Sequence, residues 1–91
     1  MKEPLFAEIW KLILSNQGKK FHTITNFEFE YRIKGNSFFL SQTKFRVSRN
    51  DFEKAYKLVP IDGPDAISKF VRGPAYVWAV LHDPRISLGK W

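Results

Sequence analysis

Apolar residues recur at helical spacing near the start of the chain. Across residues 5–17, apolar side chains cover more than half of the helix circumference and leave Glu8, Lys11 and Ser15 on a narrow polar stripe. A proline precedes this stretch and a glycine follows it, which suits the two ends of a helix. We therefore expect a helix over residues 5–17 that is buried on more than one side.

From residue 27 the period of the pattern changes to two. Phe27, Phe29, Tyr31 and Ile33 alternate with charged residues, which is typical of a strand with one buried face and one wet face. The dipeptide at 35–36 is Gly-Asn, and both residue types tolerate the positive φ of a tight hairpin turn. The chain is therefore expected to return along residues 37–41.

A two-residue loop also fixes the pairing of the two strands. The expected facing pairs are Ile33 with Phe38, Arg32 with Phe39, and Tyr31 with Leu40. Strict alternation further along would bury Lys44 and Arg46, which costs more free energy than bending the strand. We therefore expect a bulge or a second turn between Ser41 and Lys44, after which Phe45 and Val47 face the core. A shorter strand at residues 21–25 would make the sheet three- or four-stranded.

The second half of the chain is dominated by helical patterns. Ser48 has the spacing of a helix N-cap, with Asp51 at the third helical position, and the helix that follows should end before Pro60. Residues 67–71 suggest one or two further helical turns. Residues 75–81 fit a buried helix or a buried strand, and we favour a helix because a proline at 74 suits a first helical position.

The last residues carry a weaker pattern. Asp83-Pro84 is expected to end the helix, and the tail from Arg85 should be loose apart from Ile86 and Leu88. Taken together, the patterns predict one α+β domain over residues 1–91. Its order is an N-terminal helix, an antiparallel sheet of three to four strands, and two helices packed on one sheet face.

Composition narrows the functional classes. The chain has 91 residues, a formal net charge of +6 and no cysteine, so it can form neither a disulfide nor a thiolate zinc site. It has only two histidines and no glycine-rich phosphate loop, so we expect no metal and no cofactor. No apolar run approaches the roughly 20 residues of a membrane span, and we expect a cytoplasmic protein with no membrane partner.

The positive charge is concentrated in one segment. Residues 19–50 carry seven positive and two negative side chains, so most of the excess lies on the predicted sheet. Phosphates attract lysine and arginine, and an unstacked base can lie on an aromatic ring. These observations predict a DNA- or RNA-binding module whose site residues are Lys19, Lys20, Arg32, Lys34, Phe39, Lys44, Arg46 and Arg49.

Other interpretations remain open at this stage. The same cations suit the solvated face of any small soluble protein, with Glu28 and Glu30 pairing across the strands. The chain could instead be a protein-interaction or regulatory module, or a homodimer, that docks through its apolar first or last helix. A third hypothesis is a metal-independent ribonuclease. The residues chemically suited to that reaction are His22, Glu28, Glu30, Arg32, Lys44 and Arg46. We favour a non-enzymatic module because no catalytic motif accompanies these residues.

Overall fold

Helix α1, Phe6–Ser15, forms the first element of the computed structural model, which describes residues 6–40 and 46–89. Its inner side carries Phe6, Ile9, Trp10 and Ile13, all buried. Gly18 follows the helix with a φ of 80°, the left-handed conformation that favours glycine after a helix end. The predicted N-terminal helix is therefore confirmed, although Leu14 on its outer side is partly exposed.

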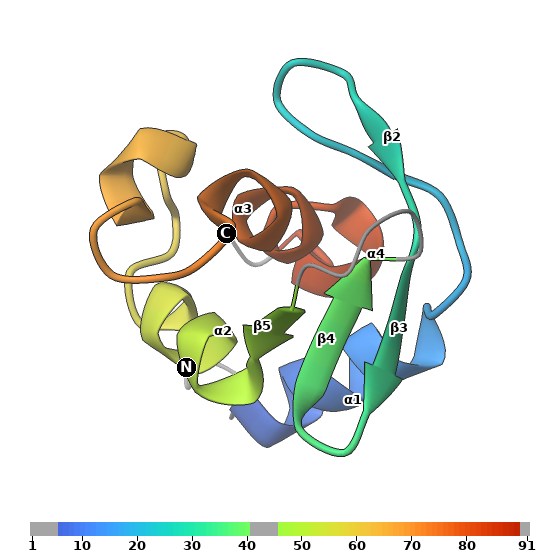
Figure 1. Ribbon diagram of the computed structural model, residues 1–91. Helices are drawn as coiled ribbons and strands as arrows, with labels where there is room; N and C mark the ends of the chain where they lie inside the picture. The colour runs from blue at the N-terminus through green and yellow to red at the C-terminus, as the bar shows by residue number, and fades with distance from the viewer. Residues whose placement is uncertain (1–5, 41–45, 90–91) are drawn as a thin grey trace.

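Five short strands follow within the described residues and form two antiparallel sheets. Strands β1, Phe21–His22, and β2, Glu28–Phe29, make a two-stranded sheet. Strands β3, Tyr31–Lys34, β4, Ser37–Leu40, and β5, Arg46–Ser48, make a three-stranded sheet in the order β3-β4-β5 (Figure 1). The α+β class is confirmed, but two sheets stand where the sequence predicted one.

The end of helix α1 explains why β1 does not extend the larger sheet. The backbone N–H of Gly18 donates to the carbonyl of Tyr31 at 3.0 Å, and the Gln17 side chain accepts from the N–H of Ile33 at 2.7 Å. These bonds occupy the outer edge of β3. Strand β1 can therefore pair only with the stretch before Tyr31, where Phe21 faces Phe29.

The register of the hairpin agrees with the sequence prediction. Residues 35–36 form the loop, and Gly35 takes a φ of 57°. The paired residues are Tyr31 with Leu40, Arg32 with Phe39, Ile33 with Phe38, and Lys34 with Ser37. Val47 faces inward opposite Phe38, as predicted. The predicted bulge between Ser41 and Lys44, and the inward-facing Phe45, lie outside the described residues.

The placement of Phe27 in the core is the clearest error of the sequence prediction. A tight turn closes residues 23–27: the N–H of Phe27 donates to the Thr23 hydroxyl at 3.0 Å, and Asn26 adopts a φ of 67°. Strand β1 therefore ends at His22 instead of Thr25. The turn leaves Phe27 51% exposed, because β2 begins only at Glu28.

Four helical segments complete the chain. Helix α2, Arg49–Tyr56, begins at Ser48, whose side chain accepts from the N–H of Asp51 as predicted, and ends before Pro60. A 3-10 turn, η1, covers Pro64–Ile67, earlier than the predicted turns at 67–71, and Phe70 is exposed. Helix α3, Pro74–Leu81, confirms the preference for a helix there.

The predicted loose tail, which began at Arg85, is wrong for residues 85–87. A short helix, α4, covers Pro84–Ser87, and the Asp83 side chain caps it by accepting from the N–H of Arg85 at 2.9 Å. Asp83-Pro84 thus starts a helix as well as ending one, because aspartate suits the N-cap and proline the first helical position. Ile86 is buried as predicted, whereas Leu88 is exposed.

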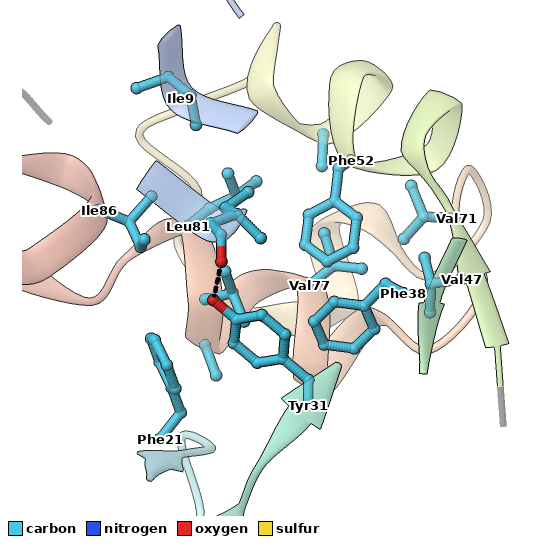
Figure 2. Close-up of a cluster of buried hydrophobic side chains, with 14 of the residues drawn as sticks. Ile9, Phe21, Tyr31, Phe38, Val47, Phe52, Val71, Val77, Leu81 and Ile86 are labelled. Carbon is cyan, nitrogen blue, oxygen red and sulfur yellow. Dashed lines mark hydrogen bonds between the residues drawn. The ribbon is translucent and has the colours of Figure 1, made fainter. Parts of the chain in front are cut away.

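Aromatic rings dominate the core between the sheets and the helices. Tyr31 stacks on Phe38 with ring centroids 4.7 Å apart, and Phe38 meets Phe52 of α2 at 4.9 Å. The Tyr31 hydroxyl donates a hydrogen bond of 2.6 Å to the backbone carbonyl of Ile13, as Figure 2 shows. Burial raises the pKa of this phenol above its ordinary value, so it stays protonated and keeps donating.

We expect Tyr31→Phe to lower the free energy of unfolding by about 1 kcal/mol, because the variant keeps the ring but loses a buried hydrogen bond. Urea unfolding followed by circular dichroism measures the change. Phe27→Leu is the control, since a change at this exposed ring should stay within about 0.5 kcal/mol. Equal stability of Tyr31→Phe and the unchanged protein would show that the bond contributes nothing.

Candidate nucleic-acid interface

The outward face of the three-stranded sheet gathers predicted site residues from three strands. Arg32 on β3 pairs with Phe39 on β4, and Phe39 pairs with Arg46 on β5. Side chains directly opposite each other in a sheet lie on the same face. The three residues therefore form one row across the sheet, with the aromatic ring between two guanidinium groups.

Lys34 extends this row along the same face. It lies two residues beyond Arg32, opposite Ser37, and alternation along the strand places both on the outward side. We call Arg32, Lys34, Phe39 and Arg46 the basic face. Its three cations are exposed and Phe39 is half-buried.

The basic face is hollowed and carries no compensating acid among the described residues. A hollow of about 310 Å³ is lined, within those residues, by Arg32, Lys34, Phe39 and Leu40. Across 6–40 and 46–89, no carboxylate lies within 4 Å of the three cations, and the ion pairs found there involve Lys20 and Arg85 instead. A surface of this kind attracts anions and offers part of an aromatic ring beside them.

The remaining predicted site residues are placed elsewhere. Lys20 lies beside the small sheet and pairs with Glu28 at 3.1 Å, while its neighbour Lys19 is exposed at the end of the α1 connection. The Arg49 guanidinium lies over the rings of Phe6 and Trp10, 5.0 and 5.8 Å from their centroids. Arg49 therefore packs against α1 instead of joining the basic face. Lys44 lies outside the described residues.

The candidate ribonuclease residues are only partly brought together. His22 and Glu28 face each other across β1 and β2, whereas Arg32 and Arg46 belong to the other sheet. The carboxylate of Glu28 is already paired with Lys20. Within the described ranges no group of three or more His, Asp or Glu side chains is arranged to hold a metal ion.

Helix α1 offers little apolar surface for a docking partner. Its residues Phe6, Ile9, Trp10 and Ile13 face the core, and the large exposed apolar side chains are scattered over other segments as well. They are Leu14, Ile24, Phe27, Leu58, Phe70 and Leu88. The described helices also include none that is long and apolar enough to cross a membrane.

A polar cluster near the C-terminal helix centres on Arg85. Arg85 forms a two-point contact with the Asp83 carboxylate at 2.9 and 3.0 Å, donates to the carbonyl of Lys20 at 2.8 Å, and covers the Phe21 ring at 4.1 Å. Burial opposes ionisation of Asp83, but the hydrogen bonds and charge of Arg85 outweigh it and hold its pKa below the ordinary value. The cluster joins α4 to β1, so its cation serves the fold.

His82, at the end of α3, holds the connector between α2 and η1. Its Nε2 accepts from the backbone N–H of Ile61 at 3.1 Å, while the indole N–H of Trp78 donates to the Ile61 carbonyl at 2.9 Å. The two rings stack with centroids 5.0 Å apart. Burial lowers the pKa of His82 from its ordinary value, because the charged form would be desolvated.

Comparison of the chain with protein-family models, with curated protein sequences and with solved structures found no match.

The lowered pKa of His82 predicts a loss of stability in mild acid. Below about pH 6.5 the unfolded chain takes up a proton that the folded His82 resists, so the free energy of unfolding falls until the pH passes the folded pKa. His82→Gln places an amide there that can accept the hydrogen bond from Ile61 but does not titrate. It should flatten this part of the plot of unfolding free energy against pH. Urea unfolding between pH 8 and pH 5 measures the slope.

The exposed His22 supplies the matched control for this measurement. His22→Gln removes the other histidine and should keep the slope of the unchanged protein. A slope that disappears in His22→Gln and persists in His82→Gln would contradict the assignment.

Proposed function

We propose that this protein binds nucleic acid through the basic face, with phosphates on Arg32, Lys34 and Arg46. The observation that supports the proposal is the row Arg32–Phe39–Arg46, which places one aromatic ring between two cations that have no acidic partner among the described residues. Lysine and arginine at such positions release counterions from a phosphate backbone when they bind it. Affinity should therefore depend steeply on salt.

The electrostatics of the rest of the described chain favour this face over the others. Lys20 is neutralised by Glu28, Arg85 by Asp83, and Arg49 is packed on aromatic rings. A second hollow, of about 190 Å³ on α2, has Glu53 beside Lys54 and Lys57. The basic face combines several unpaired cations with an aromatic ring, which is what a phosphate-and-base ligand requires.

The test is a titration of labelled 20-nucleotide DNA and RNA, single- and double-stranded, at 50 and 200 mM salt, followed by fluorescence anisotropy. We expect binding at low salt that weakens at high salt. The triple variant Arg32→Gln/Lys34→Gln/Arg46→Gln should bind more weakly. The slope of log K against log salt should fall by about 2, because each single-strand phosphate contact contributes about 0.7.

The control variant removes the same charge from other surfaces, with Lys11→Gln, Lys57→Gln and Lys69→Gln, all three exposed. Its binding should stay much closer to that of the unchanged protein. Absence of binding to every probe at 50 mM salt would refute the proposal, and so would an equal loss in both triple variants.

A further inference from the structure

Phe39 is less exposed than the cations around it. Phe39 is half-buried on the central strand β4, while Arg32 on β3 and Arg46 on β5 are exposed on either side. The exposed part of the ring borders the hollow, so a flat group placed there can contact the ring while charged groups beside it contact the cations.

The dimensions of the hollow suit one nucleotide. It holds about 310 Å³, and the described residues around it include Phe39 as apolar lining and Arg32 and Lys34 as charged lining, whereas the Leu40 side chain is buried in the core on the other face of the sheet. Arg32 and Lys34 lie on one face of β3 at an i, i+2 spacing, about 7 Å along the strand. A flat apolar base against Phe39 and phosphates at the two cations match this combination of groups.

A duplex cannot make the same contact. Its bases are paired and stacked inside the helix, and taking one out costs a few kcal/mol. An unpaired base of a single strand is free to turn into the hollow and stack on an aromatic side chain. The basic face alone would not discriminate between the two, because both carry phosphates on their surfaces.

We infer that the hollow seats one unpaired base of a single-stranded nucleic acid on Phe39, with the flanking phosphates on Arg32 and Lys34. This inference rests on the proposed function. It adds the class of ligand, a single-stranded nucleic acid, and the side chain that selects it, Phe39. Stacking is tolerant of sequence, since every base has an aromatic face. The selection is for unpaired strands over duplexes, and not for one base over another.

The test compares a 12-nucleotide oligothymidylate with an abasic strand of the same length, so that the phosphates are equal and only the bases differ. We expect the unchanged protein to bind the oligothymidylate roughly 10-fold more tightly than the abasic strand. It should also prefer the oligothymidylate over a 12-base-pair duplex. Phe39→Leu should bring the two single strands to nearly equal affinity, whereas Phe39→Tyr, which keeps the ring, should retain the difference.

The double variant Arg32→Gln/Lys34→Gln is the matched comparison. It should weaken the binding of both single strands and still prefer the oligothymidylate over the abasic strand. Thermal unfolding by circular dichroism checks that each variant is folded. If the unchanged protein binds the oligothymidylate and the abasic strand equally, the inference is overturned while the proposed function stands. If it binds neither strand nor the duplex, the proposed function itself fails.

Discussion

An unbroken series of aromatic contacts connects the strands to the helices, and the rest of the fold depends on it. It runs from Phe29 through Phe21, Tyr31, Phe38 and Phe52 to Trp10 and Phe6, so it passes through both sheets, α2 and α1. Each ring buries a large apolar area, and tilted or offset ring pairs add a further favourable term. The high aromatic content of the sequence is therefore used largely inside the molecule, and the tyrosine within the series satisfies its hydroxyl on a helix carbonyl.

The same series explains why net charge is a poor guide to how the cations are distributed over the surface. Arg85 lies over Phe21, the second ring of the series, and Arg49 lies over Phe6, the last, so two cations of the basic chain cover aromatic rings. Such contacts hold the guanidinium groups against the fold. The three cations of the basic face project instead from β3 and β5 on the outward side of the sheet.

The local pattern of residues was enough to predict most of the elements and the register of the hairpin. It predicted the ends of the elements less well. The period-two run from Phe29 to Ile33 and the Gly-Asn turn specify the pairing, because a slip of one residue would bury Arg32. The row Arg32–Phe39–Arg46 follows from that register once Val47 faces inward. The second sheet could not be predicted, since it depends on Gly18 and the Gln17 side chain reaching β3 from another element. The contact of Arg49 with Phe6 and Trp10 could not be predicted for a similar reason: these aromatic partners are distant in sequence.

The occupied edge of β3 also limits how this protein can associate with others. An exposed strand edge invites an additional strand from a peptide or from another copy of the chain. Here the carbonyl of Tyr31 and the N–H of Ile33 are already satisfied by the last turn of the first helical segment. Adding a strand on this side would require that turn to detach. At these two positions a peptide approaching the edge of β3 therefore meets backbone groups that are already bonded, which disfavours sideways growth of the sheet there.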